Sequence, residues 1–253
     1  EEDLLLDFAL VLHQVSLAAN TIRNVLSGVR FQHVASGFPD PLVGRPRLSL
    51  LLRGLKRKSG VGKKKFPVTI RMMLQLNWVL FSTKAEAKTQ RAVAGLKDRD
   101  AVVVWAGMTT ALMFLLRGGE WLAHDGRGFD LAKVILGVGV KPLSGPQASN
   151  AGWADAEQVS IQVRASKVDQ FNVGTWRNHY VSGEVVCPVK ALQELQRQHP
   201  ERFGSGEECQ LPLFRRANGN PLWRSQVQTL VDWAADKEGL PPARFGSHSF
   251  RIG

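Results

Sequence analysis

Three short segments carry side chains that could act together on a phosphate group. The first is RGGE at 117–120, which follows a long apolar stretch. An arginine beside a buried helix can be held rigidly, and Glu120, one turn on, can orient the guanidinium of Arg117. The alternative is a helix C-terminus, where the glycines end the helix and the arginine faces the helix dipole.

The second segment contains Lys167, near the tip of a predicted hairpin, in the sequence ASKVDQ. A lysine at a hairpin tip can reach a neighbouring groove. There its ammonium group can donate a proton or neutralise a phosphate. The alternative is an ordinary lysine in a surface turn.

The third segment is HSFR at 248–251. Residues three apart share a helix face, so His248 and Arg251 would point the same way. Imidazole carries a proton near neutral pH, and a guanidinium binds phosphate oxygens with two parallel hydrogen bonds. Such a pair suits a phosphate site, although the same spacing also arises by chance in a basic protein.

Taken together and in this order, the three segments resemble the tyrosine recombinase (phage integrase) family. The resemblance rests on RGGE at 117–120, SKVDQ at 166–170 and HSFR at 248–251, and it extends over nearly the whole chain. The phrases GFPDP, RLSLLLRGLKR and SKVDQF are most similar to the DIRS-type or Crypton-type recombinases of eukaryotic mobile elements. The resemblance implies a DNA-binding protein that exchanges or integrates DNA strands.

The resemblance also implies roles for individual residues in a reaction that needs no metal and no cofactor. Arg117 and Arg251 would neutralise the non-bridging phosphate oxygens. Lys167 would protonate the departing 5′-oxygen, and His248 would hydrogen-bond the phosphate or assist the nucleophile. Glu120 would orient the first arginine, and a tyrosine would form a 3′-phosphotyrosyl intermediate.

The nucleophile is the point at which this sequence departs from the family pattern. The family's tyrosine follows the H-x-x-R segment by some tens of residues, whereas these residues stop at Gly253 and contain one tyrosine, Tyr180, in the predicted hairpin. We therefore expect these residues to bind DNA without cleaving it. They are either a fragment of a longer open reading frame or a domesticated relic that has kept binding and lost the chemistry. Relatives act as homotetramers on DNA, and for this chain alone we expect a monomer.

The net charge of +11 independently favours a polyanionic partner, most often nucleic acid. An anionic membrane is a competing explanation, but the apolar stretch 101–116 is shorter than the ~18 residues that a spanning helix needs. The chain opens with Glu1 and Glu2, which predicts no signal peptide. The main alternative to a recombinase is a basic DNA- or RNA-binding protein that is not descended from an enzyme.

The positive charge is concentrated near the N-terminus, where residues 21–71 hold twelve lysines and arginines against one acid, Asp40. We expect DNA contacts from Arg23, Arg45, Arg47, Arg53, Lys56, Arg57, Lys58, Lys63, Lys64 and Lys65. The runs at 56–58 and 63–65 also fit a solvated face or a bipartite nuclear-import signal.

Composition and periodicity predict a basic helical domain at 1–60, a flexible linker at 61–68 and an α+β domain at 69–253. The family resemblance implies that the first is a core-binding domain and that the last is a catalytic domain, incomplete at its C-terminal end. The fold expected is mostly α with a small β-hairpin or sheet (α+β). Hydrophobic periodicity predicts helices at 4–19, 21–34, 48–58, 69–81, 99–116, 188–198 and 225–237, with strands at 131–140, 159–168 and 177–181. Thr21 and Thr69 are the expected N-caps.

Two cysteines, Cys187 and Cys209, have no metal-ligand spacing and predict a reducing compartment. We therefore expect an intracellular protein, in the nucleus if eukaryotic and otherwise in the cytoplasm or nucleoid.

Overall fold

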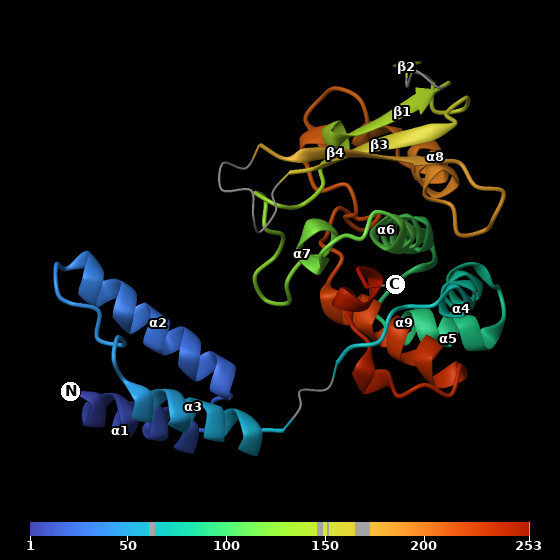
Figure 1. Ribbon diagram of the computed structural model, residues 1–253. Helices are drawn as coiled ribbons and strands as arrows, with labels where there is room; N and C mark the ends of the chain where they lie inside the picture. Colours follow the sequence, from blue (N-terminus) through green and yellow to red (C-terminus); the bar gives the residue numbers. More distant parts are fainter. Residues whose placement is uncertain (61–63, 146–148, 151, 165–172, 253) are drawn as a thin grey trace. The chain divides into compact units, whose positions relative to one another are not determined.

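The computed structural model describes residues 1–60, 64–145, 149–150, 152–164 and 173–252. The chain divides into two compact units, Glu1–Lys64 and Lys65–Gly253. The fold is mostly α with a small antiparallel sheet, as predicted (Figure 1). None of the helices in the described ranges is long and apolar enough to cross a membrane.

The first unit is a bundle of three helices, α1 (Glu2–Gln14), α2 (Ala19–Ala35) and α3 (Pro46–Lys58). Its small core contains Leu5, Ile22, Leu26, Leu48 and Leu55. Two predicted boundaries were wrong. The first helix was expected to continue to residue 19, but Ser16 takes a left-handed φ of 64° and ends it early. The second helix then starts at Ala19, so Thr21 lies inside it instead of capping it.

The predicted linker was too long at its C-terminal end. Phe66 N–H donates to the carbonyl of Arg244 (2.7 Å), and Val68 N–H donates to that of Ser249 (3.0 Å). The ammonium group of Lys65 donates to the carbonyls of Ala243 (3.0 Å) and Phe245 (2.6 Å). Residues 65–68 therefore belong to the second unit, to which they are hydrogen-bonded. Residues 61–63 lie outside the described part.

The longer helices of the second unit are α4 (Ile70–Phe81), α5 (Ala85–Val93), α6 (Ala101–Met113), α8 (Pro188–Gln198) and α9 (Arg224–Lys237), with a single turn at α7 (Gly118–Trp121). Short 3-10 turns are η1 (Asp98–Asp100), η2 (Gly137–Gly139), η3 (Pro200–Arg202), η4 (Glu208–Gln210), η5 (Pro242–Arg244) and η6 (Ser247–Phe250). The predicted cap at Thr69 is confirmed, because its hydroxyl accepts from Met72 N–H at 3.2 Å. Helix α5 was missed because its sequence is mostly polar.

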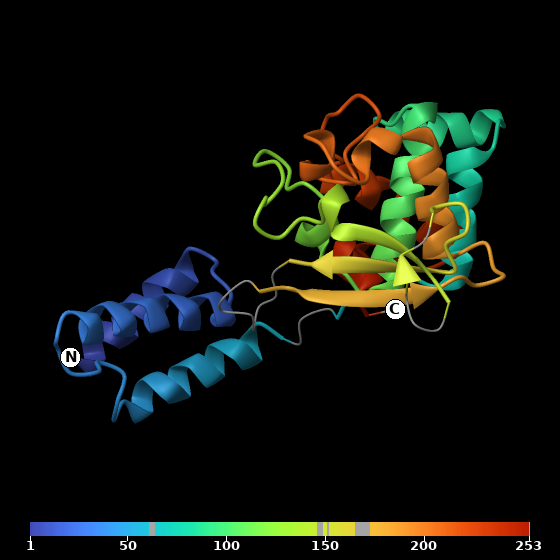
Figure 2. The ribbon, with the colours of Figure 1, turned by 90° about the horizontal axis from the view of Figure 1, so that it is seen from above.

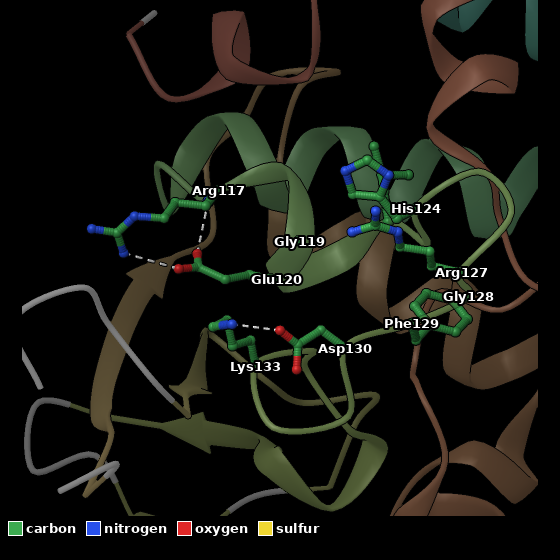
Figure 3. Close-up of a pocket in the computed structure, with 10 residues that line it drawn as sticks. Arg117, Gly119, Glu120, His124, Arg127, Gly128, Phe129, Asp130 and Lys133 are labelled. Carbon is green, nitrogen blue, oxygen red and sulfur yellow. Dashed lines mark hydrogen bonds and ion pairs between the residues drawn. The ribbon is translucent and has the colours of Figure 1, made fainter. Parts of the chain in front are cut away.

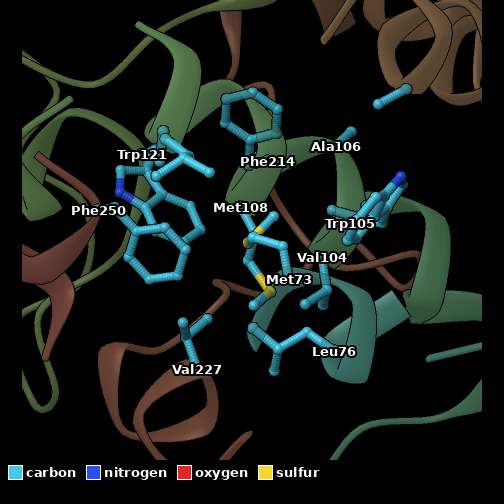
Figure 4. Packing of buried hydrophobic residues seen from close by; sticks show 14 of the residues in the cluster. Met73, Leu76, Val104, Trp105, Ala106, Met108, Trp121, Phe214, Val227 and Phe250 are labelled. Carbon is cyan, nitrogen blue, oxygen red and sulfur yellow. The ribbon is translucent and has the colours of Figure 1, made fainter. Parts of the chain in front are cut away.

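Helix α6 is the centre of the second unit. It is apolar on all sides and is buried between α4 and α8, as expected for a helix without a polar face. Figure 4 shows Met108 of this helix in the same cluster as Trp121 and Phe250. Gly107 lets the chain approach this closely, since a Cβ there would lie 3.0 Å from Trp121 Cε3.

The sheet has four antiparallel strands in the order β2-β1-β3-β4: β1 (Val140–Ser144), β2 (Ser149–Asn150), β3 (Gln158–Val163) and β4 (Thr175–Tyr180). Figure 2 shows β1, β3 and β4 side by side. The predicted hairpin is present, with Val163 opposite Thr175, but its tip at 165–172 lies outside the described residues. Alternate residues of β3, including Val159 and Ile161, are buried in the main core.

The strand expected at 131–140 was wrong. Its apolar residues are mostly buried, but they form turns and η2 before β1 begins at Val140. Gly137 packs closely against another segment, because a Cβ there would collide with the carbonyl oxygen of Arg202. Ile135 N–H instead donates to the carbonyl of Glu120 (2.8 Å), which ties this segment to α7.

Asp100 fixes the start of α6. The residue is 1% exposed, and its carboxylate accepts from Lys97 N–H (2.9 Å), Ala217 N–H (3.0 Å) and the guanidinium of Arg216 (3.0 Å). Burial alone would raise the pKa of Asp100, but the hydrogen bonds from Lys97, Ala217 and Arg216 together lower it below its usual value.

This ionised carboxylate predicts a specific pH dependence of stability. A group with a depressed folded pKa stabilises the fold above its unfolded pKa and loses that effect as pH falls through the folded pKa. Replacing Asp100 with Asn should lower the free energy of unfolding by about 2 kcal/mol at pH 7. The difference between wild type and variant, measured by urea unfolding, should shrink from about pH 4 downward. A difference that stays constant down to about pH 3 would contradict the assignment.

Candidate functional site

The turn between α6 and α7 positions the first candidate arginine. Leu115 takes a left-handed φ of 54°, and Leu116 N–H donates back to the carbonyl of Ala111 (2.9 Å). Leu116 is fully buried, so the chain is anchored immediately before Arg117. The alternative, an arginine at a helix C-terminus, was wrong: Arg117 directly precedes the first residue of α7.

Arg117 and Glu120 form a fixed pair. One oxygen of Glu120 accepts from the backbone N–H of Arg117 (2.8 Å), and the other accepts from its Nη1 (3.1 Å). The carboxylate side chain is 4% exposed and the arginine side chain is 38% exposed. Glu120 therefore holds the guanidinium from one side, while part of the Arg117 side chain remains accessible (Figure 3).

The HSFR segment forms η6 with Arg251 directly after it. It was expected to lie on a helix, but in the described residues it is a single 3-10 turn. Side chains three residues apart eclipse in a 3-10 turn, so His248 and Arg251 share a face. Phe250 is fully buried and meets Trp121 edge-on at 5.4 Å between ring centroids.

The RGGE and HSFR segments lie against each other although they are far apart in the sequence. Arg251 Nη1 donates to the carbonyl of Leu115 at 3.4 Å, two residues before Arg117. A Cβ on Gly118 would lie 2.7 Å from Ser247 Oγ, so a glycine is required for this packing. The structure thus brings the two predicted arginine segments together.

The other two predicted residues have different outcomes. His248 is exposed, and its ring makes no hydrogen bond with the described residues. Lys167 lies outside the described residues, so its position relative to Arg117 stays a prediction. The nearest described residue before it, Arg164, donates from Nη1 to the carbonyl of Leu131 (2.6 Å).

Sequence reasoning missed two further arginines beside this turn. Arg177 of β4 donates from Nη1 to the carbonyl of Phe114 (2.9 Å), next to the carbonyl that Arg251 uses. Arg224 reaches Gly118, with Nη2 3.1 Å from where a Cβ would stand, and its buried Nε has no partner in the described part. No local sequence signal marks either residue, although Arg177 lies on the same side of β4 as His179, whose ring contacts Phe114 in the structure.

The predicted DNA-binding residues between Arg23 and Lys65 fall into two groups. Arg45 and Arg47 are paired with acidic residues at the start of the chain, Glu1 and Asp3, at 2.5 Å and 2.7 Å. With Lys65 bound to carbonyls, these three are less available than the sequence predicted. The exposed side chains that form no salt bridge with the described residues are Arg23, Arg53, Lys56, Arg57 and Lys58. Lys64 is also exposed, and Lys63 lies outside the described residues.

Comparison with protein-family models finds no match, and comparison with curated proteins finds none either. Within the described ranges, no three His, Cys, Asp or Glu side chains gather as metal ligands.

The contact between Gly118 and Ser247 predicts a difference between two adjacent glycines. A Cβ on Gly118 would also lie 3.0 Å from the Cβ of Ser247, whereas a Cβ on Gly119 would meet nothing within 4 Å. Replacing Gly118 with Ala should therefore lower the free energy of unfolding by about 1–3 kcal/mol. Replacing Gly119 with Ala should change it by less than about 0.5 kcal/mol. Equal effects in urea unfolding would mean that the two segments are not packed as described.

Proposed function

We propose that this chain is the DNA-binding and phosphate-binding part of a tyrosine recombinase, which cleaves and rejoins DNA through a 3′-phosphotyrosine without a metal ion. The observation that carries the proposal is the contact of the HSFR segment with the turn that leads into RGGE. Arg117 and Arg251 each follow a buried residue, and the two segments are in contact. Two arginines held in this way bind one phosphate better than two scattered cations would, because their side chains lose little conformational freedom on binding.

In this proposal the phosphate lies between Arg117 and Arg251. Both guanidinium groups would donate to its non-bridging oxygens and neutralise the charge that builds up during displacement. Glu120 keeps Arg117 oriented, since its carboxylate already occupies one edge of that guanidinium. Arg251 would exchange its long hydrogen bond to Leu115 for shorter bonds to the phosphate.

The remaining steps are assigned to residues by the family resemblance. Lys167 would protonate the 5′-oxygen of the departing strand, and His248, exposed on the face of Arg251, would hydrogen-bond the phosphate. Tyr180 is the one tyrosine among these residues. It lies on β4, and the proposal gives it no nucleophilic role. These residues would therefore bind DNA without cutting it. The proposal places the protein with the DNA, in a eukaryotic nucleus or otherwise in the cytoplasm or nucleoid.

The first unit supports the proposal through its charge. Helix α3 ends in Lys56, Arg57 and Lys58, all exposed. Cations of this kind bind the DNA backbone irrespective of sequence and release its condensed counterions. Two cation-bearing units on one chain would allow contact with DNA at two places.

The experiment that tests the proposal is DNA-binding anisotropy with a fluorescent duplex. Replacing either Arg117 or Arg251 with Ala should weaken binding by about ten-fold, since each change removes charge-assisted hydrogen bonds to a phosphate. The control is Arg99→Ala, which removes the same charge from an exposed position in η1. Its effect should be under about three-fold.

Weakening to the same degree in all three variants would mean that binding follows net charge alone. That outcome would favour the alternative, a basic DNA- or RNA-binding protein with no descent from a recombinase.

A second prediction separates free cations from paired ones in the first unit. Arg57 is exposed, whereas Arg47 is bound to Asp3. Replacing Arg57 with Gln should make the slope of log K against log salt shallower by about 0.9, because one fewer phosphate is then neutralised. The matched change Arg47→Gln should alter the slope less. The reverse order of effects would show that the Arg47 pair opens on DNA and that α3 does not provide the contact.

A further inference from the structure

A pocket of about 560 Å³ begins at Arg117 and Glu120 and extends along the loop that follows α7. Its size is typical of sites for small organic molecules. Figure 3 shows Arg117 on one side of Glu120 and the residues His124 and Arg127 on the other. The pocket therefore joins the proposed phosphate site to a second group of side chains that the proposed mechanism does not use.

The loop that forms the far wall is held in place. His124 N–H donates to the carbonyl of Gly128 (2.8 Å), which closes a tight turn around Arg127. Asp125 accepts from both the hydroxyl and the backbone N–H of Ser225 at the start of α9. The hydroxyl hydrogen bond lowers the pKa of Asp125, so its carboxylate stays ionised and the anchor persists at neutral pH.

The lining of the pocket is amphipathic. Leu122 and Phe129 supply apolar surface, and an aromatic ring can stack on a flat ligand. The two acids in the lining are already paired, Glu120 with Arg117 and Asp130 with Lys133. The side chains of His124 and Arg127 form no salt bridge or hydrogen bond with the described residues, so donors remain available at one end.

We propose that this pocket receives an unpaired nucleobase of the DNA strand whose phosphate lies on Arg117. A nucleobase has two apolar faces and a polar edge with hydrogen-bond acceptors, which match Phe129 and Arg127. The inference rests on the proposed function, because strand exchange requires nucleotides beside the cleaved phosphate to leave their duplex. A pocket adjoining the phosphate site would hold the base of such a nucleotide while the nucleotide leaves one complementary strand and pairs with another.

The proposal is tested on the full chain with two fluorescent duplexes of the same sequence. Both carry a nick with a 3′-phosphate, and in one of them the nucleotide beside the nick is an unpaired 2-aminopurine. Wild type should bind the unpaired probe about ten-fold more tightly, and the 2-aminopurine fluorescence should fall as the base stacks.

The decisive variants are Phe129→Leu, which keeps apolar volume but removes the ring, and Arg127→Gln. Each should remove most of the preference for the unpaired probe, while affinity for the paired probe falls by less than about three-fold, as for the loss of any one exposed charge. The control Phe81→Leu changes an exposed ring at the end of α4 and should leave the preference intact. Phe129→Leu and Phe81→Leu should unfold at similar urea concentrations.

Two outcomes would overturn the proposal: no preference in wild type, or an equal loss of affinity for both probes in the pocket variants. The second outcome would mean that the loop contacts the duplex backbone. Failure of the proposed function looks different, because Arg117→Ala and Arg251→Ala would then behave like Arg99→Ala on the fully paired probe, whatever Phe129→Leu does.

Discussion

The structure of the site depends on one turn, the left-handed Leu115 that separates α6 from α7. Because α6 is buried on all sides and Leu116 is again buried, the turn is anchored in the core at both ends. The two carbonyls that this turn exposes, of Phe114 and Leu115, are bound by Arg177 and Arg251 from distant parts of the chain. Three arginines therefore lie at this turn: Arg177 of β4, Arg251 after η6, and Arg117 before α7.

The second constraint is electrostatic. Arginines crowded together repel one another, and a site of this kind is costly unless acids, carbonyls or a bound anion compensate. Here Glu120 compensates Arg117, and carbonyl oxygens take one nitrogen of Arg177 and of Arg251. The partner-free Nε of Arg224 shows that compensation is incomplete in the described part. A phosphate diester would supply further acceptors to the accessible nitrogens of Arg117 and Arg251, which is why we propose a ligand of that class.

Much of the fold could be predicted from sequence where one physical signal dominates. Helix α8 has an amphipathic period and a proline at its first position, and its predicted bounds match the structure. The hydroxyl of Thr69 likewise marks the start of α4. Prediction failed at 131–140, where β-branched residues favour a strand but the chain forms turns and η2, with a close approach of Gly137 to the Arg202 backbone. That approach is a tertiary contact, and no local pattern records it.

The candidate site divides in the same way. Arg117, Glu120 and Arg251 were named from the family resemblance, and three-residue spacing added only that the members of each pair share a face. Arg177 and Arg224 could not be named from spacing, since their contacts with the turn depend on how the sheet and α9 pack. The paired state of Arg45 and Arg47 was missed for the same reason: their partners, Glu1 and Asp3, are far away in the sequence.

The central claim is that Arg117 and Arg251 bind one phosphate together. A double-mutant cycle on duplex affinity measures this most directly, with the single changes to Ala and the double change compared. Two groups on one phosphate should show a coupling energy of about 1 kcal/mol or more, so the double variant should lose less than the sum of the singles. The parallel cycle of Arg117 with Arg99 should be additive within about 0.5 kcal/mol. Additivity in both cycles would contradict the account, because the two arginines would then act on separate phosphates.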